Sequence, residues 1–526
     1  MVEAVEDRLA PAVVGVLSIS GTTLTYSGFV QNSNNVTVSG TAAALTFVDA
    51  GGTIQNNTGG RFVNGGPLPG FVTGVAINGN DLTDVANVPV AGLDLGTRAL
   101  TLSSNFINVS GNISARAVTL NATQTNVTSA SVIATNAAVN PAAGAVTFTT
   151  NLNVGASLTI NTDSVTDGNV TFNRLVSGGG SLTVNAGTGG NIAAANLISL
   201  GGSAALSTSG DTISLKQVVA NAGVTIRAQN AVTLAGTLSS AGDLVIEANQ
   251  DGVGGQGFTQ TAGDLNTSAL NAAIRVNTSS GGTGSAQLRN LVVGAGGTVN
   301  IDTTGLPGGG GAVLDGNGPG LVNVTFAAPG GNLQINASTR GVNLDTQVST
   351  ITFNIDSGSS SVGSLAIRNT QFALTNVTGA TTNGSITLSN NNHIFADFVF
   401  ADGTNADLTI TTTSSSPNKN IQIGLDGIAA DGDQILLSAT GTINDSGSES
   451  AVQSRVLILI AGDGIGTISA FGTAVDTVNA RTVVGGIQIE EDGSLIVTGA
   501  TASAGNLGIS TSITENSDLT INGPVS

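Results

Sequence analysis

The chain of 526 residues contains no cysteine and no tryptophan, and methionine, tyrosine and histidine each occur once. A disulfide-stabilised scaffold is therefore excluded, and a single histidine cannot supply the several cysteine or histidine ligands of a usual zinc site. Aromatic residues make up only 3% of the chain, although hydrophobic residues make up 40%. The apolar material is thus alanine, valine, leucine and isoleucine, which predicts a large but thin core of small side chains.

Charge is also scarce, and it is mostly of one sign. Charged residues make up 9% of the chain, and 14 basic residues stand against 33 acidic ones, which gives a formal net charge of −19. The basic residues are spread singly along the sequence. Because an acidic surface repels nucleic acid and anionic membranes, we expect neither as a partner.

Long hydrophobic runs are missing as well. The best are Leu9–Leu17 and Val456–Ala461, far short of the ~20 apolar residues that a transmembrane helix needs, so no membrane insertion is expected. A secretory signal peptide is not visible, because the region before Leu9 is acidic rather than basic. Few Lys, Glu, Gln and Met residues disfavour helices, and the apolar content argues against disorder.

A four-residue pattern recurs: Ser, Asp or Asn, then an aliphatic residue, then usually Thr, then an aliphatic residue or Phe. Alternation of apolar residues with Thr is the period-2 signature of a half-buried strand. We therefore predict strands whose second and fourth residues point inward. Asn often follows, and because it tolerates the left-handed conformation it suits a corner, as at Asn161, Asn185, Asn336 and Asn522. The clearest examples of the pattern are Ser157–Ile160, Asn169–Phe172, Ser181–Val184, Asp243–Ile246, Asn323–Phe326, Ser385–Leu388, Asp407–Ile410 and Asp518–Ile521.

The spacing of these strands distinguishes between two candidate all-β folds, a stacked solenoid and an array of sandwich domains. Ser157 and Ser181 are 24 residues apart, and the gap from Ser181 to Asp211 is 30, with Gly-, Ser-, Asn- and Ala-rich segments between. Imperfect repeats of this length indicate a stacked architecture. The sequence therefore predicts a parallel β-solenoid (β-helix) with two or three short strands in each coil. A tandem array of sandwich domains is the alternative, but it requires units of ~100 residues with large core aromatics.

The segment Ala461–Thr467, with the sequence AGDGIGT, resembles the A-G-x-x-I-G-T phrase of filamentous-haemagglutinin-like and autotransporter-like bacterial surface proteins with β-strand repeats. The following Gly485–Ile489 and Leu495–Val497 are similar to the sequel of that phrase. The segment Val2–Pro11, with the sequence VEAVEDRLAP, is similar to an L-E-D-R-x-x-P phrase near the start of some large bacterial surface proteins. The resemblance implies a right-handed parallel β-helix displayed outside the cell.

Three regions follow from the regularity of the repeats. Residues 1–20 are expected to form an N-terminal arm, residues 21–130 irregular first coils or a cap, and residues 131–526 the β-solenoid repeats.

The sequence points to no catalytic centre, and we expect that the chain is not an enzyme. Nucleophilic triads need a base, usually His, and the one candidate, His393, lies in an Asn-rich segment typical of a solvated loop. Carboxylates such as Asp163, Asp167 and Glu247 stand without clustered basic or aromatic residues. Solvated charges at corners are therefore preferred over the carboxylate pair of a polysaccharide-degrading β-helix enzyme.

Calcium is the ligand hypothesis that the sequence favours among metals. Asp426, Asp431 and Asp433 place three carboxylates on a glycine-rich stretch, and hard cations bind several oxygen ligands from flexible turns. We predict these three as calcium ligands; no other cofactor is expected.

The expected function is structural: an extracellular or cell-surface protein that forms a fibre or filament by head-to-tail contact with copies of itself. The strand pattern at Asp518–Ile521 offers an edge for further pairing, and the apolar Leu9–Leu17 is expected to dock on the neighbour's last coil. Adhesion to host or matrix glycans is a further partner hypothesis. The alternatives are a carbohydrate-active β-helix enzyme and a glycan-binding adhesin.

Overall fold

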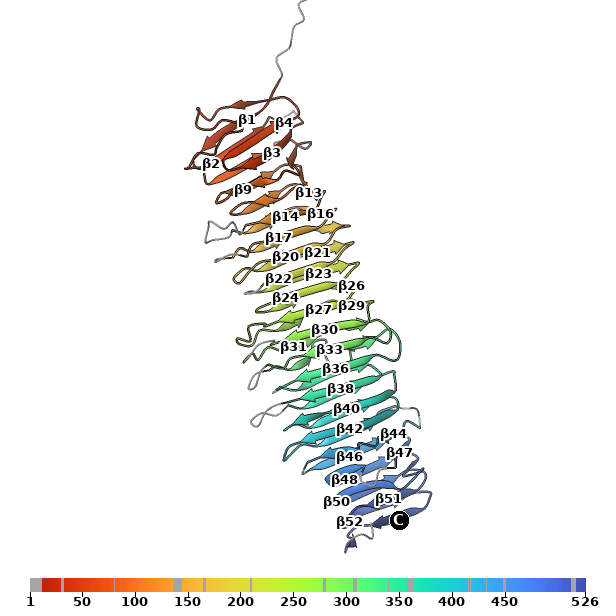
Figure 1. Ribbon diagram of the computed structural model, residues 1–526. Helices are drawn as coiled ribbons and strands as arrows, with labels where there is room; N and C mark the ends of the chain where they lie inside the picture. Colours follow the sequence, from red (N-terminus) through yellow and green to blue (C-terminus); the bar gives the residue numbers. More distant parts are fainter. Residues whose placement is uncertain are drawn as a thin grey trace, which may run out of the picture. The chain divides into compact units, whose positions relative to one another are not determined.

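The computed structural model describes residues 12–29, 33–79, 81–135, 144–163, 167–208, 211–277, 281–305, 310–338, 340–356, 363–414, 416, 418–431, 433–447, 451–511 and 517–526. Within these ranges the chain forms 54 β-strands and no helix, and nearly all paired strands run parallel. The predicted all-β, parallel β-solenoid is thereby confirmed (Figure 1). Two compact units, residues 1–241 and 242–526, are described separately.

Unit 1 is built from stacked coils. Each coil contributes one short strand, or part of a longer strand, to each of three rows. Within a row, the strands of successive coils pair in parallel. Row A contains β6 (Gly74–Asn78), β9 (Ala99–Ser103), β12 (Val118–Asn121), β15 (Val146–Phe148), β18 (Val170–Phe172), the first parts of β21 (Ile192–Leu200) and β23 (Ile213–Ala220), and β25 (Val232–Leu234). Row B contains β7 (Val85–Val88), β10 (Phe106–Val109), β13 (Gln124–Val127), β16 (Asn151–Val154), β19 (Val176–Gly178), the second parts of β21 and β23, and β26 (Leu238–Ser240). Row C contains β8 (Leu93–Asp94), β11 (Ile113–Ser114), β14 (Ser131–Ala134), β17 (Leu158–Asn161), β20 (Leu182–Asn185), β22 (Ala204–Thr208) and β24 (Val224–Ala228).

Two antiparallel hairpins precede these rows. β1 (Val13–Ser20) pairs with β2 (Thr23–Gly28), and β3 (Asn35–Thr41) pairs with β4 (Ala44–Asp49). β1 also pairs in parallel with β5 (Thr53–Asn56), and β2 and β3 continue into the rows through β6 and β7. Of the arm predicted over residues 1–20, residues 1–11 lie outside the described ranges and most of the remainder is β1.

The hairpins enclose a buried polar group around the single tyrosine. The Tyr26 hydroxyl donates a hydrogen bond to the Asp49 carboxylate. The backbone N–H of Asn34 donates to Oδ1 of Asp84 at 2.8 Å. All four side chains are buried. Burial, followed by the bond to Asp49, raises the pKa of Tyr26, so the phenol stays protonated and able to donate.

Unit 2 repeats the three-row plan. Row D contains β27 (Leu244–Ala248), β30 (Asn271–Val276), β33 (Thr298–Asp302), β36 (Asn332–Ala337), β38 (Thr350–Ile355), most of β40 (Leu374–Thr382), the second part of β42 (Ile394–Asp402), β45 (Ile428–Ala430) and the first parts of β48 (Val452–Ala461) and β50 (Phe471–Thr482). Row E contains β28 (Phe258–Gln260), β31 (Ala286–Leu288), β34 (Val313–Asp315), β37 (Val342–Gln347), β39 (Leu365–Asn369), β41 (Ile386–Asn390), β43 (Leu408–Thr412), β46 (Gln434–Ala439), the second parts of β48 and β50, β52 (Leu495–Ala502) and β54 (Leu519–Ile521). Row F contains β29 (Leu265–Thr267), β32 (Leu291–Val293), β35 (Val324–Phe326), β44 (Ile421–Ile423), β47 (Thr442–Asp445), β49 (Gly464–Ile465), β51 (Ile487–Glu491) and β53 (Leu507–Thr511).

The core lies inside the coils, and the prediction of which residues face it is confirmed. The second and fourth residues of the patterns at 157–160, 181–184 and 407–410 are no more than 1% exposed. Leu158 lies in register with Leu182, and Ile160 with Val184, so equivalent side chains stack from coil to coil. The pattern at 518–521 differs, because Leu519 is 42% and Ile521 is 57% exposed.

Asn161, Asn185, Asn336 and Asn522 were expected at corners because asparagine tolerates the left-handed conformation, but none of them has a positive φ. Asn161 and Asn185 instead complete β17 and β20. Their Oδ1 atoms accept hydrogen bonds from the N–H groups of Asp163 (3.0 Å) and Gly187 (3.2 Å), the arrangement of an Asx turn. Among described residues, the left-handed asparagines are Asn249, Asn277, Asn383 and Asn418.

Outward asparagines form a ladder along row B. Nδ2 of Asn108 donates to Oδ1 of Asn87 at 3.0 Å, and Nδ2 of Asn126 donates to Oδ1 of Asn108 at 3.1 Å. These residues are aligned in the strand register. Side-chain amides therefore link successive coils in addition to the backbone ladder.

The described ranges hold no apolar helix of membrane-spanning length.

Candidate functional site

The three predicted calcium ligands do not come together into one group. Asp426 lies in the corner before β45, whereas Asp431 directly follows that strand. Oδ1 of Asp433 lies 3.2 Å from Nη2 of Arg455, as an ion pair. Gly432, between the latter two aspartates, lies outside the described residues. In the part of the chain that the structure describes, no three Asp, Glu, His or Cys side chains form a group able to hold a metal ion.

His393 lies exposed in the turn before β42. Its Nδ1 accepts a hydrogen bond from the backbone N–H of Asn420, on the next coil, at 3.0 Å. Partial burial and the positive charge of Lys419 lower the pKa of His393, which favours the neutral ring that can accept this bond. The histidine therefore joins two coils.

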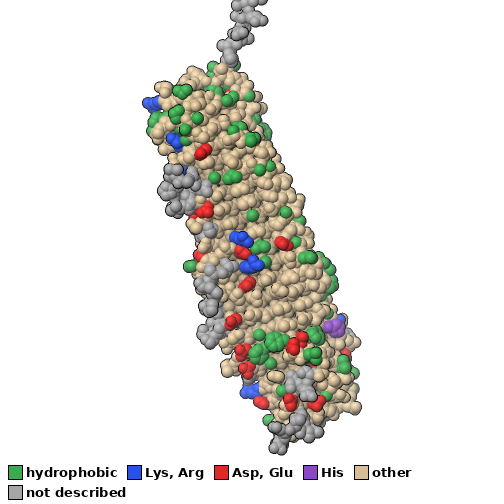
Figure 2. Space-filling view, viewed as in Figure 1, with side chains coloured by type: hydrophobic (Ala, Val, Ile, Leu, Met, Phe, Trp, Pro, Cys, Tyr) green, Lys and Arg blue, Asp and Glu red, His purple; other side chains and the backbone are tan. Residues whose placement is uncertain are grey.

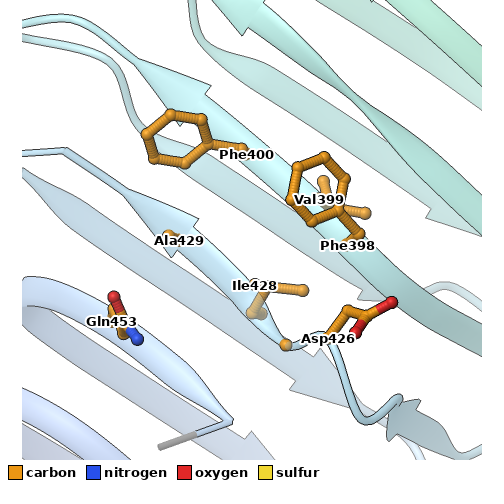
Figure 3. Close-up of a pocket in the computed structure, with 8 residues that line it drawn as sticks. Phe398, Val399, Phe400, Asp426, Ile428, Ala429 and Gln453 are labelled. Carbon is orange, nitrogen blue, oxygen red and sulfur yellow. The ribbon is translucent and has the colours of Figure 1, made fainter.

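A surface hollow of about 310 Å³ lies on row D of unit 2, beside the corner between rows F and D. We call it the aromatic hollow, and it is lined by Phe398, Val399, Phe400, Asp426, Gly427, Ile428, Ala429 and Gln453. Figure 3 shows that these residues come from β42, from the turn into β45, from β45 itself and from the next strand along the stack.

The strand register explains the shape of the aromatic hollow. Phe400 of β42 is aligned with Ala429 of β45, which is aligned with Gln453 of β48. These outward positions lie one strand spacing apart, so the backbones of Phe400 and Gln453 are ~10 Å apart. Because the methyl group of Ala429 stands between two long side chains, it leaves a depression with an aromatic wall on one side and an amide wall on the other.

The corner residues complete one end of the aromatic hollow. Phe398 has φ 58° and its side chain is 50% exposed. A left-handed conformation costs a residue with a Cβ roughly 1–2 kcal/mol, and a large aromatic side chain rarely adopts it. The neighbouring Asp397 accepts a hydrogen bond from the backbone N–H of Asp426 at 3.1 Å, which ties the corners of two successive coils together. The chain therefore holds an aromatic ring in solvent at an energetic cost.

The polar lining of the aromatic hollow consists of one carboxylate, Asp426, and one amide, Gln453, both exposed. Within the described residues neither side chain hydrogen-bonds to another protein group. The carboxylate can accept hydrogen bonds from a ligand, and the amide can both donate and accept them.

A second hollow of about 370 Å³ on unit 2 is lined by Gly263, Asp264, Arg289, Asn290, Asn317, Leu321 and Val322. Its polar groups bond to one another and to the backbone. Nδ2 of Asn290 donates to Oδ1 of Asp264 at 2.9 Å, and Nη1 of Arg289 donates to the carbonyl of Gly316 at 3.0 Å. These bonds stabilise the corner itself and make this hollow the weaker candidate.

The sequence alone singled out Asp426 but not Phe398, Phe400, Ala429 or Gln453. The pair of phenylalanines two residues apart was the available signal, because alternate residues of a strand share a face. Which coil lies beside them could not be known. Over the visible surface, charged side chains are scattered rather than gathered (Figure 2).

No protein-family model, curated protein or solved structure matches this chain.

Proposed function

We propose that this protein is a structural β-solenoid of an extracellular or cell-surface fibre, in which the face of β54 adds to a second copy of the chain. The single observation that carries the proposal is a pair of apolar residues on β54, which are aligned with core residues of β52 but are themselves exposed. Leu519 and Ile521 lie in register with Leu495 and Val497. The latter pair is 1% exposed, whereas Leu519 and Ile521 are 42% and 57% exposed.

The physical argument rests on the pairing capacity of that face. The coils of this chain add to one another by parallel strand pairing, and Leu519 and Ile521 supply an apolar pair that a coil of a second copy can cover. A head-to-tail contact between different surfaces propagates into a filament unless the rotation closes a ring. The acidic, cysteine-free composition and the repeat resemblance described above support a position outside the cell.

The test compares the 526-residue chain with the variant Leu519→Lys/Ile521→Lys by light scattering and negative-stain electron microscopy over a concentration series. We expect filaments for the parent chain and monomers for the variant, since two lysines place charge on the proposed contact. Thr520→Ser is the matched control, because Thr520 is aligned with the outward Ile496 and the change adds no charge; it should still form filaments. A parent chain that stays monomeric, or a double variant that still forms filaments, would overturn the proposal.

A further inference from the structure

We propose that the aromatic hollow of unit 2 binds neutral hexopyranose units of a glycan chain. The hollow lies wholly within unit 2 and does not depend on β54, so this inference stands apart from end-to-end assembly.

The aromatic groups give the first argument. Phe398 is half exposed on a strained left-handed corner, and Phe400 stands two residues further along the same strand. Core packing does not explain the outward Phe398 ring, and a glycine would hold the corner without strain. Strained residues cluster at ligand-binding positions, where the surrounding structure over-determines them. Flat apolar rings at a surface offer a stacking face to the apolar C–H side of a pyranose.

The polar groups give the second argument. The Asp426 carboxylate can accept hydrogen bonds, and the Gln453 amide can both donate and accept. Hydroxyl groups around the edge of a sugar ring present both kinds of partner. Two aromatic rings with a carboxylate and an amide at the margins thus match a ligand with apolar faces and a hydroxylated edge.

Charge decides between neutral and acidic sugars. Asp426 carries a negative charge at the rim, and the chain has a formal net charge of −19. A uronate or sulfated sugar would meet like charge at the rim and in the surrounding field. The preferred ligand is therefore an uncharged hexose chain.

The shape indicates a short, weak subsite. A volume of about 310 Å³ lies at the lower end of the range for small-molecule sites. The depression left by Ala429 opens to solvent between Phe400 and Gln453, so a bound ring can continue into further sugars on either side. We expect a dissociation constant of roughly 1 mM for such a shallow site.

The experiment measures binding of cellohexaose, laminarihexaose and mannohexaose to the 526-residue chain by saturation-transfer NMR and calorimetry, with hexagalacturonate as the acidic probe. At least one neutral hexasaccharide should bind and hexagalacturonate should not. Phe400→Ala should weaken that binding roughly tenfold, in line with the loss of one aromatic contact. Phe106→Ala is the matched control, because Phe106 of β10 is an exposed strand phenylalanine in unit 1; it should leave binding unchanged.

Phe398→Gly separates a binding role from a structural one. Glycine accepts the positive φ without strain, so this variant should unfold at the same or a higher denaturant concentration than the parent while binding the glycan at least several-fold more weakly. Binding that survives both Phe400→Ala and Phe398→Gly overturns the proposal. Failure of all three neutral probes to bind at about 10 mM, or stronger binding of hexagalacturonate, overturns it equally.

Discussion

The rings of Phe148 and Phe172 stack with their centroids 5.2 Å apart and their planes 13° from parallel. The two residues are aligned in the β15–β18 register, and both are fully buried. The centroid separation is close to the strand spacing of ~4.8 Å. Equivalent side chains on successive coils are therefore held face to face by the backbone ladder itself.

The first prediction concerns this stack. Phe172→Ala should destabilise the coils around β15 and β18 by about 3–5 kcal/mol, because it opens a cavity and removes the ring contact. Neighbouring coils of a solenoid unfold partly independently. Local amide hydrogen exchange followed by mass spectrometry is therefore the appropriate measurement.

Phe172→Leu is the matched variant, since it keeps an apolar side chain at the position and should cost less than Phe172→Ala. Equal acceleration of exchange in the two variants would contradict the packing argument.

The second prediction compares two ion pairs in unit 2. Nε and Nη2 of Arg368 each donate a hydrogen bond to the Asp345 carboxylate, both at 2.7 Å. Asp345 is buried, and its Oδ2 also accepts from the N–H of Gly320 at 2.6 Å. Arg368→Ala should therefore destabilise this region by about 1–2 kcal/mol, because it removes two hydrogen bonds to a buried carboxylate. The loss is moderate because the arginine side chain is itself partly solvated.

Arg455→Ala is the control for that pair. Arg455 makes one bond of 3.2 Å to Asp433, and its side chain is 62% exposed. Its loss should cost less than about 1 kcal/mol. Urea titrations followed by region-specific hydrogen exchange should rank the two variants in this order, and a larger effect at Arg455 would refute the argument.

The third prediction is a pH dependence at Glu491. Its side chain is buried, Oε2 accepts from Thr473 Oγ1 at 2.6 Å, and Oε1 accepts from the N–H of Val475 at 2.9 Å. Burial raises the pKa of Glu491 from its ordinary 4.5 to about 7, with a smaller contribution from nearby Asp492 and Asp476, while the two hydrogen bonds oppose the rise.

Between pH 4.5 and 7 the folded chain keeps a proton on Glu491 that the unfolded chain has released. Stability around β51 should therefore fall as the pH rises through this window, with a slope approaching about 1.4 kcal/mol per pH unit. Glu491→Gln stays neutral and can keep both contacts, so it should remove the slope and stabilise the region at pH 8. Identical pH profiles of hydrogen exchange for parent and variant would exclude this role.

The fourth prediction concerns His393. Because its ring accepts one exposed hydrogen bond, His393→Ala should change stability by no more than about 1 kcal/mol. The pKa of His393 is lowered from 6.5, so the unfolded chain takes up the proton first as the pH falls. The bond's contribution is complete above pH 6.5 and is lost as the pH falls through the lower folded value.

As the pH rises, stability increases through the titration of His393 and decreases through that of Glu491, so the two effects can be measured separately. In the parent chain, hydrogen exchange of the Asn420 amide, corrected for the intrinsic exchange rate, should become faster as the pH falls. In His393→Ala, the corrected rate should not respond to this titration. A large loss of stability in the variant would show that the ring has a role beyond this bond.

Local patterning was sufficient to predict the strands and their inward faces. The alternation at residues 157–160 and 407–410 specifies which side chains are apolar, and a strand can bury only every second residue. The corners were harder to predict. Asn161 was expected at a corner because asparagine tolerates the left-handed conformation, but its side chain instead accepts a local hydrogen bond from Asp163. The choice between these two uses of asparagine depends on the path of the neighbouring coil.

The aromatic hollow shows the limit of sequence reasoning most clearly. Phe400 is aligned with Ala429, 29 residues later, and Ala429 with Gln453, 24 residues later. Because the coils differ in length, no constant repeat brings these three residues together. Their alignment follows from the inward packing of Val399 and Ile428, which are 1% and 3% exposed, and which set the register for the outward positions beside them.

By itself, therefore, the sequence determined an all-β chain of stacked coils with a thin aliphatic core, because strand periodicity and side-chain size are local properties. Only the tertiary structure decided that the chain opens with antiparallel hairpins around Tyr26 and Asp49, that Asp433 pairs with Arg455, and that Phe398 stands at the rim of a hollow. Each of these depends on which coil lies beside which. That registry is set by the summed packing and hydrogen bonding of many residues, and no short segment encodes it.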